Sequence, residues 1–335
     1  MKISLAHYFF FLQRLLIFIL DTFYMQMEVT LQVKNVTIIG SGLMGHGIAL
    51  KFAQYNCNVI VYDPNDVSLD SLFERIEISL SQMEIKKEEI KKIISSINKT
   101  NNLEQALEKA EFVIEAVPEK LDLKQNIFKE IEKLAPQDCI FASNTSVIQI
   151  TKIVDQMVNK NRALGTHWWN PPHLIPLVEV IKTEWTDEKA MNKTIQLLKD
   201  IGKTPVRVEK DVPGFIGNRL QHALWREAIS LVENGVCDAE AVDTVIKSSF
   251  GRRLSVLGPL ENADLVGTDL TLDVHENVLF DLEKSEKPSN LLVDLVEKGK
   301  LGMKSGEGFK KWKDQDLETT KSKISKFLKN LEKII

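Results

Sequence analysis

The sequence predicts an α/β fold, in which an N-terminal domain with a parallel sheet precedes a mostly helical C-terminal domain. Its 335 residues exceed a typical single domain of about 100–200 residues, so two domains are expected. Short runs rich in Val and Ile alternate with amphipathic helical stretches up to about residue 208, which is the order of βαβ units. From Gly214 onward the apolar residues recur at helical spacing, as at Leu220, Leu224 and Leu231.

Each predicted element rests on its own apolar run. Asn35–Ile39 and Asn58–Tyr62 are expected as strands on either side of a helix from Leu43 to Tyr55. Shorter strands are expected at Phe112–Ala116, Ile140–Ala142 and Ala163–Gly165. The tail Lys321–Ile335 has apolar residues at helical spacing, which predicts a packed or dimer-contacting helix. We therefore expect a sheet domain over residues 31–210 and a helical domain over residues 211–335.

Composition excludes several classes of protein. The 43 Lys and Arg against 47 Asp and Glu give a net charge of -4, which disfavours nucleic-acid binding because phosphates need a basic surface. Cys57, Cys139 and Cys237 are far apart and form no metal-ligand spacing, so neither a disulfide framework nor a structural metal is expected. We expect a cytoplasmic protein.

The first thirty residues differ from the rest. Residues 3–20 are strongly apolar, but Gln13 and Arg14 divide them, and an Arg at mid-bilayer costs about 2.5–3.5 kcal/mol. No small-residue cleavage site follows them. Because Met25 and Met27 stand just before the first strand, we interpret residues 1–30 as an extension outside the fold, with a loose membrane anchor as the less favoured alternative.

A glycine-rich loop follows the first strand. Its sequence, Gly40-Ser41-Gly42-Leu43-Met44-Gly45, has the G-x-G-x-x-G spacing and leads directly into a helix. In a Rossmann-type domain the first Gly makes a tight turn, the second admits a pyrophosphate, and the third permits close helix packing. The N–H groups of the helix N-terminus then bind the phosphates. The loop, with Leu43 and Met44 inside it, predicts a dinucleotide site.

Asp63 ends the second strand, where a carboxylate can accept both hydroxyls of the adenosine ribose. It would repel a 2′-phosphate, and no Arg or Lys follows until Arg75. A turn cap before Pro64 is the alternative role for this residue. With strand, loop, helix and strand in the right order, we predict NAD rather than NADP as the cofactor.

His167 and Glu179 form the predicted catalytic pair. Glu179 interrupts the apolar run Leu177–Ile181, and a lone buried carboxylate is costly. If the two segments are neighbouring strands, Glu179 faces His167, fixes its tautomer and raises its basicity. The other histidines in the domains, His46, His173, His222 and His275, have no such partner in the sequence.

From about Val33 to Trp312 the chain resembles the 3-hydroxyacyl-CoA dehydrogenase family. The matching motifs are GSGLMGHGIA at 40–49, EAVPEKLDLK at 115–124, SNTS at 143–146, HWWNPP and LVEVI within 167–181, PGFIGNRL at 213–220 and GMKSGEGF at 302–309. The resemblance implies an NAD-dependent L-3-hydroxyacyl-CoA dehydrogenase that forms a homodimer through its helical substrate domain.

The resemblance also implies further site residues. Glu119, Lys124, Asn144 and Lys304 match family positions that line the nicotinamide half of the cofactor site. Ser146 and Asn218 match positions that hydrogen-bond the substrate beside the reacting carbon. By sequence alone, Ser146 equally fits a helix cap near Val147, and Asn218, Glu119 and Lys124 equally fit polar helix surface.

Three departures from the family pattern leave the substrate open. The segment Asp66–Glu84 has Arg75 as its one cation among several acids, which suits a polyanionic CoA head poorly. Trp168 and Trp169 replace two common Phe residues. The longer segment 250–261 resembles that of L-gulonate and carnitine dehydrogenases, and its Arg253 is suited to a free carboxylate or, equally, to a surface ion pair.

Three functional hypotheses follow. The first is an acyl-CoA dehydrogenase, and the second is a dehydrogenase of a small free 3-hydroxy acid. The third is an NAD-binding structural or regulatory protein without turnover, which the retention of Ser146, His167, Glu179 and Asn218 disfavours.

Overall fold

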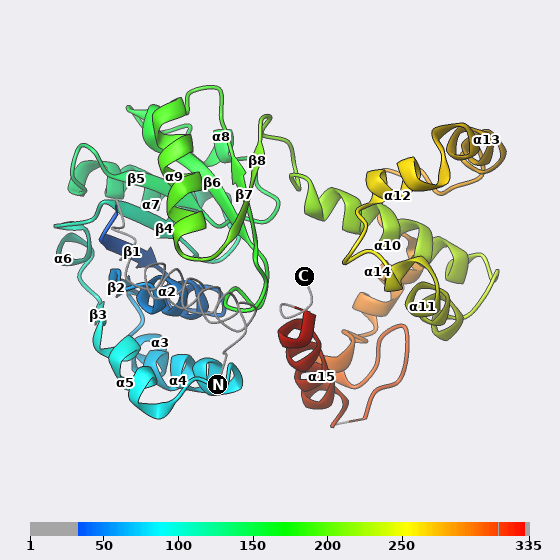
Figure 1. Ribbon diagram of the computed structural model, residues 1–335, viewed down its shortest axis with the longest axis horizontal. Helices are drawn as coiled ribbons and strands as arrows, with labels where there is room; N and C mark the ends of the chain where they lie inside the picture. Colours follow the sequence, from blue (N-terminus) through cyan, green and yellow to red (C-terminus); the bar gives the residue numbers. More distant parts are fainter. Residues whose placement is uncertain (1–32, 314, 332–335) are drawn as a thin grey trace, which may run out of the picture.

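The computed structural model describes residues 33–313 and 315–331. The predicted extension over residues 1–30 lies outside these residues. Figure 1 shows an N-terminal lobe built on a sheet and a separate helical lobe, joined by the segment after β8. Within the described part of the chain, no helix is long and apolar enough to cross a membrane.

The sheet has eight strands in the order β3-β2-β1-β4-β5-β6-β7-β8. All neighbouring strands are parallel except β6 and β7, which are antiparallel. The strands are β1 (Asn35–Ile39), β2 (Asn58–Tyr62), β3 (Ile97–Thr100), β4 (Phe112–Glu115), β5 (Ile140–Ser143), β6 (Ala163–Trp168), β7 (Leu177–Ile181) and β8 (Thr204–Val208). The predicted α/β class is confirmed, and β1 and β2 have the predicted bounds.

Helices cover both faces of the sheet. On one face Ile48 and Phe52 of α2, with Leu197 of α9, pack on strand residues such as Ile38. On the other face Phe128 of α7 joins a second core. The helices of this domain are α2 (Gly45–Gln54), α3 (Asp66–Asp70), α4 (Leu72–Gln82), α5 (Lys87–Ser95), α6 (Leu103–Leu107), α7 (Leu121–Leu134), α8 (Ile150–Ile153), α9 (Glu188–Asp200) and the 3-10 turn η1 (Lys160–Arg162).

The sequence did not predict β3 and β8, and it ended β6 at Gly165, three residues too early. Both missed strands lie at the edges of the sheet. Edge strands carry polar residues and tolerate Pro, so they lack a continuous apolar run. In β8 the sequence TPVRV illustrates this, with Pro205 and Arg207 inside the strand. Pairing with β7 extends β6 through His167 to Trp168.

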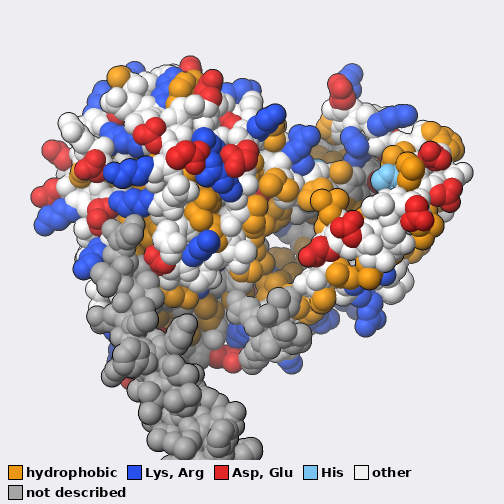
Figure 2. All heavy atoms as spheres, turned by 45° about the horizontal axis from the view of Figure 1, so that its top comes forward, with side chains coloured by type: hydrophobic (Ala, Val, Ile, Leu, Met, Phe, Trp, Pro, Cys, Tyr) orange, Lys and Arg blue, Asp and Glu red, His pale blue; other side chains and the backbone are white. Residues whose placement is uncertain are grey.

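The second lobe is helical, as predicted. It contains α10 (Gly217–Glu233), α11 (Ala239–Ser248), η2 (Phe250–Arg252), α12 (Pro259–Val266), α13 (Thr268–Val278), α14 (Asn290–Glu297), η3 (Met303–Ser305) and α15 (Asp316–Leu331). Of the described residues after Phe215, only Ser230 is buried. Figure 2 accordingly shows apolar side chains over the surface of this lobe. The tail helix α15 returns toward the first domain, where Lys329 lies 3.2 Å from Glu84.

His173, in the loop between β6 and β7, is buried against α2, and neither ring nitrogen has a hydrogen-bond partner among the described residues. Burial, together with the nearby His46, Lys203 and Lys51, lowers the pKa of His173 to about 4. The folded state therefore binds this proton less readily than the unfolded chain, whose histidine has a pKa near 6.5.

We expect the free energy of unfolding to be largest above pH 6.5 and to decline by about 3 kcal/mol toward pH 4, because protons then bind preferentially to the unfolded chain. His173→Phe should flatten this decline, since it removes the buried titrating ring. Urea unfolding at a series of pH values measures the free energy of unfolding of the parent protein and of the variant. An equal pH slope in the variant would show that His173 is not responsible.

Candidate active site

The glycine loop has the shape that a pyrophosphate requires. Gly40 has a φ of 101°, and an added Cβ would lie 2.8 Å from the carbonyl oxygen of Ala116. A Cβ on Gly45 would lie 1.8 Å from the Gly40 oxygen, so helix α2 starts directly against the loop. A Cβ on Gly42 would meet no protein atom within 4 Å. The open space at Gly42, beside an uncapped helix N-terminus, fits the dinucleotide.

Asp63 closes one side of this loop. One carboxylate oxygen accepts the Ser41 N–H at 2.9 Å and the Ser41 hydroxyl at 2.8 Å, and the other accepts the Asn65 N–H at 3.0 Å. Asp63 thus fixes the loop as well as the turn that follows it. Its role toward the ribose stays a prediction.

Arg75 on α4 is part of the same support. Its guanidinium donates to the carbonyl of Ser41 at 2.6 Å and to the carbonyl of Ser68 at 2.8 Å. The cation of the segment Asp66–Glu84 is therefore turned toward the glycine loop instead of toward a ligand outside it.

His167 and Glu179 are directly opposite each other on the antiparallel strands β6 and β7. Both side chains are buried, and Nδ1 of His167 lies 2.7 Å from Oε2 of Glu179. Because a carboxylate accepts, Nδ1 carries the hydrogen and Nε2 keeps its lone pair. Trp169 and Phe215 flank the imidazole, with ring centroids at 5.2 and 5.6 Å.

The second oxygen of Glu179 holds the start of the helical domain. Oε1 accepts the N–H groups of Ile216 and Gly217, at 2.8 and 2.9 Å, where α10 begins. No side chain of α10 caps this end, so Glu179 supplies the cap from the sheet. Burial acts to raise the pKa of Glu179, but hydrogen bonds from His167, Gly217 and Ile216 hold that pKa below its usual value.

The two tryptophans after His167 point in different directions. Trp168 is buried in the core, 5.9 Å from Phe52 between ring centroids, while Trp169 lies beside His167 and against Gly217. Only Trp169 is therefore placed to shape the site at this histidine.

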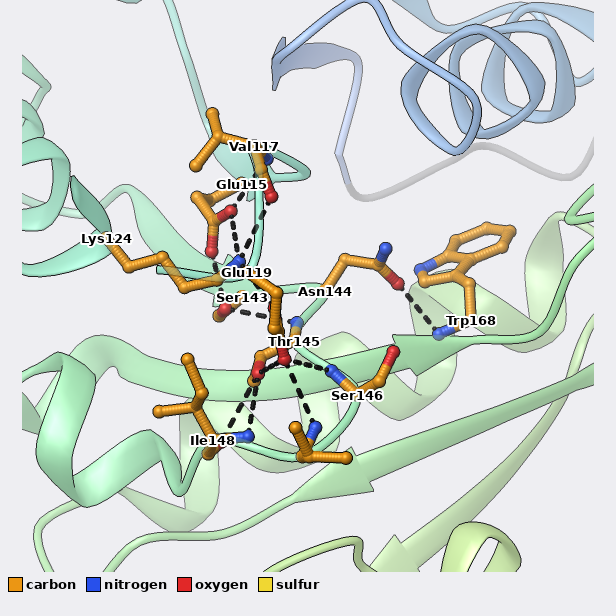
Figure 3. A network of polar contacts seen from close by, with 11 residues as sticks. Glu115, Val117, Glu119, Lys124, Ser143, Asn144, Thr145, Ser146, Ile148 and Trp168 are labelled. Carbon is orange, nitrogen blue, oxygen red and sulfur yellow. Dashed lines mark hydrogen bonds and ion pairs between the residues drawn. The ribbon is translucent and has the colours of Figure 1, made fainter. Parts of the chain in front are cut away.

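A buried network supports the carboxyl edge of β4 and β5 (Figure 3). The ammonium of Lys124 on α7 binds Glu115 at 2.7 Å, Glu119 at 3.2 Å and the Val117 carbonyl at 3.4 Å. An ammonium has three donors, so these three acceptors can use them all. Ser143 donates to the other oxygen of Glu115. Lys124 is buried, and the alternative of a solvated helix surface is wrong for it.

Sequence reasoning missed Glu115, which the structure places at the centre of this network. It ends the apolar strand FVIE, and the criterion that singled out Glu179, a carboxylate in an apolar run, also applies to it.

Glu119 shapes the turn that presents Ser146. Its Oε1 accepts the N–H groups of Ser146 and Val147, at 2.9 and 3.2 Å, and the Thr145 hydroxyl (Figure 3). Burial acts to raise the pKa of Glu119, but the Thr145 hydrogen bond, the Lys124 charge and these backbone groups hold it below its usual value.

Ser146 and Asn218 meet at this turn. The Asn218 amide on α10 donates to the Ser146 carbonyl at 2.8 Å, so it joins the two domains beside the site. Ser146 is not a helix cap, because α8 begins at Ile150 after Gln149. Nearby, Oδ1 of Asn144 accepts the Trp168 N–H at 2.9 Å and ties the turn to β6.

Lys304 and Arg253, two further predicted site residues, lie apart from the cluster around His167 and Ser146. Lys304 lies in η3 and lines a groove of the helical domain, and Arg253 is exposed after η2. Within the described residues, neither side chain forms a hydrogen bond or ion pair with His167, Asn144 or Ser146. Their predicted roles stay predictions.

Family comparisons match both domains. The 3-hydroxyacyl-CoA dehydrogenase NAD binding domain matches residues 35–212, and the 3-hydroxyacyl-CoA dehydrogenase C-terminal domain matches residues 214–312. The chain belongs to the 3-hydroxyacyl-CoA dehydrogenase family. Its cofactor is NAD, and it is an oxidoreductase that acts on a CH–OH group.

Individual relatives differ in their substrates. Mitochondrial hydroxyacyl-coenzyme A dehydrogenase of Rattus norvegicus is 38% identical over 298 residues, which cover 84% of this chain and 92% of the relative. A 5-formyl-3-hydroxy-2-methylpyridine 4-carboxylate 5-dehydrogenase of Mesorhizobium japonicum is 35% identical over 277 residues, covering 82% of this chain and 90% of that protein. A solved structure of an enzyme with this activity, an NAD+ dependent dismutase, has a TM-score of 0.84 at 32% identity and covers 90% and 98% of the two chains.

Lys124→Met should lower the free energy of unfolding by about 3–5 kcal/mol, because it leaves the buried Glu115 carboxylate without its counter-charge. Urea unfolding measures the effect. Lys129→Met, an exposed position on the same helix, is the matched control and should change stability by about 0.5 kcal/mol or less. Equal stability of the two variants would contradict a structural role for the Lys124–Glu115 pair.

Proposed function

We propose that the chain oxidises a 3-hydroxy substrate with His167 as the base and Glu179 as its positioning carboxylate. The observation that carries the proposal is the 2.7 Å contact between Nδ1 of His167 and Glu179, whose other oxygen binds the start of α10. This contact leaves Nε2 of His167 as the acceptor for a proton. Glu179 also ties the proposed base to the start of the helical domain.

Bound NAD supplies the acceptor for the hydride that leaves the hydroxyl-bearing carbon. The protein supplies proton transfer and placement. Nε2 of His167 takes the hydroxyl proton, and the negative charge of Glu179 stabilises the imidazolium that forms. The Ser146 hydroxyl orients the substrate oxygen, since its turn is held by Glu119 from one side and by Asn218 from the other.

His167→Ala should lower kcat by about 10²–10⁴-fold, because the proton acceptor is lost, while the Kd for NADH stays near that of the parent. Glu179→Gln keeps a hydrogen-bond acceptor but removes the charge. It should lower kcat, because the imidazolium that forms loses its counter-charge. Steady-state kinetics and NADH fluorescence measure these effects. Near-normal turnover of His167→Ala would contradict the mechanism.

The first candidate substrate is an L-3-hydroxyacyl-CoA thioester. The family models and the rat relative carry that name. Lys86 and the lysines of α5 are the cations next to α4 that could meet a CoA head.

The second candidate is a small free hydroxy acid, with Arg253 binding its carboxylate. A specific observation favours it: Arg75, the cation of α4, is engaged by the Ser41 and Ser68 carbonyls. The remaining charges of α3 and α4 are acidic, which repels the phosphates of CoA. The relative from Mesorhizobium japonicum, which is named for a pyridine carboxylate, lends further support.

Two steady-state assays distinguish the candidates. The first measures NADH oxidation with acetoacetyl-CoA, and the second measures NAD reduction with free L-gulonate, carnitine or 3-hydroxybutyrate. If the substrate is a free acid, Arg253→Met should raise its KM about 10-fold or more, because a charge-assisted hydrogen bond is lost. Arg252→Met is the matched control and should leave KM unchanged. Turnover of the thioester with no effect of Arg253→Met would favour the first candidate.

We further propose that the enzyme is a homodimer. Helical domains need a buried apolar core, yet of the described residues beyond Phe215 only Ser230 is buried. A second copy would cover the apolar helix faces that one chain leaves exposed. A reducing compartment such as the cytoplasm fits the three free cysteines.

A further inference from the structure

Two backbone N–H groups of the glycine loop are open to a ligand. They belong to Gly42 and Leu43, and neither donates a hydrogen bond to any of the described residues. A Cβ on Gly42 would meet no protein atom within 4 Å, and Leu43 is 67% exposed. A pyrophosphate bound at this loop accepts from such N–H groups, so the direction in which they point decides how well it binds.

The direction of each N–H is set by the carbonyl of the same peptide group. In a planar trans peptide the C=O and the N–H point in opposite directions. The Ser41 carbonyl shares a peptide group with the Gly42 N–H, and the Gly42 carbonyl shares one with the Leu43 N–H. A protein donor that binds either carbonyl therefore turns the matching N–H away from itself.

Arg75 of α4 binds the first of these carbonyls. Its Nη1 donates to the Ser41 oxygen at 2.6 Å, while Nη2 and Nε donate to the carbonyls of Ser68 and Ser71 at 2.8 and 3.3 Å. All three partners are backbone carbonyls. Because the guanidinium is planar and its donors point in fixed directions, the Ser41 carbonyl is held in one orientation.

His46 of α2 binds the second carbonyl. Its Nδ1 lies 3.0 Å from the Gly42 oxygen, which can only accept, so Nδ1 carries the hydrogen. Nε2 then accepts from the Ser79 hydroxyl, 3.3 Å away. Both side chains are buried. Burial holds the pKa of His46 below its usual value, which favours the neutral ring that this pattern requires.

One face of α4 serves both carbonyls. Arg75 and Ser79 are one turn apart on this helix, and α4 packs against α2 (Figure 1). Arg75 reaches the Ser41 carbonyl directly, and Ser79 reaches the Gly42 carbonyl through His46. Two successive peptide groups of the loop are thus fixed from the same side.

We infer that Arg75 and His46 are positioning residues for the cofactor. They hold the carbonyls of Ser41 and Gly42 so that the N–H groups of Gly42 and Leu43 are oriented for the NAD pyrophosphate before it binds. Donors that are fixed in advance need no ordering on binding, which strengthens affinity. Helix α4 therefore supports the cofactor site from outside it.

Arg75→Met tests the first contact. It should raise the Kd for NADH and for ADP about 10-fold or more, because the Gly42 N–H is no longer held in place. The Kd for adenosine, which has no pyrophosphate, should stay near that of the parent. Fluorescence titration measures NADH, and competition against NADH measures the other two ligands. Lys109→Met removes an exposed charge from the same domain and is the control, with all three values unchanged.

Two substitutions at His46 test the second contact without removing a fixed charge. His46→Leu lacks a donor and should raise the Kd for NADH at least about 3-fold. His46→Asn places an amide N–H close to the position of Nδ1 and should restore most of that loss. In His46→Leu the KM for NAD should rise with the Kd, while kcat at saturating NAD stays near that of the parent.

Unchanged NADH affinity in Arg75→Met or in His46→Leu would overturn the role of that residue. Equal losses for ADP and adenosine would also overturn the inference, because they would assign the two residues to the stability of the domain. Failure of His46→Asn to improve on His46→Leu would exclude the hydrogen bond to Gly42 as the cause. Binding requires no substrate, so these results are independent of the base proposed at His167.

Discussion

The Glu179 carboxylate is the interaction on which the site depends. It is buried, and an unpaired buried charge costs several kcal/mol, so its partners are obligatory. One oxygen binds His167 and the other binds the first N–H groups of α10. The strand pair that holds the proposed base is thereby also the point at which the helical domain is attached. Positive φ angles at Gly214 and Phe215 make the turn that delivers those N–H groups.

A second buried carboxylate organises the facing edge of the sheet. Glu115 pairs with Lys124, and Lys124 also binds Glu119, which holds the turn at Ser146. From the other domain, Asn218 of α10 binds the same turn. Because α10 is capped by Glu179 and contacts Ser146, one helix joins the base to the residue proposed to orient the substrate. Displacement of α10 would disturb both at once.

Much of this arrangement could be predicted from sequence because its determinants are local. The glycine spacing indicates a tight turn followed directly by a helix. A carboxylate within an apolar strand needs a partner, and this argument identified Glu179. The edge strands β3 and β8 could not be predicted from apolar runs, since their exposed sides carry polar residues. The Glu115–Lys124 pair depends on how α7 packs on β4. The binding of Glu179 to backbone N–H groups could not be predicted, because almost every residue type carries such a group. Lys304 and Arg253 belong to the helical domain, where only Ser230 is buried among the described residues after Phe215, so sequence position alone does not locate their side chains.

The central claim is that Glu179 holds His167 with the hydrogen on Nδ1 and the lone pair on Nε2. Nitrogen NMR of the ¹⁵N-histidine-labelled enzyme, with the His167 resonances assigned from His167→Asn, measures this tautomer directly. The account predicts a protonated Nδ1 and an unprotonated Nε2 in the neutral ring, with a reduced preference in Glu179→Gln. A neutral ring protonated at Nε2, or a tautomer unchanged by Glu179→Gln, would contradict it.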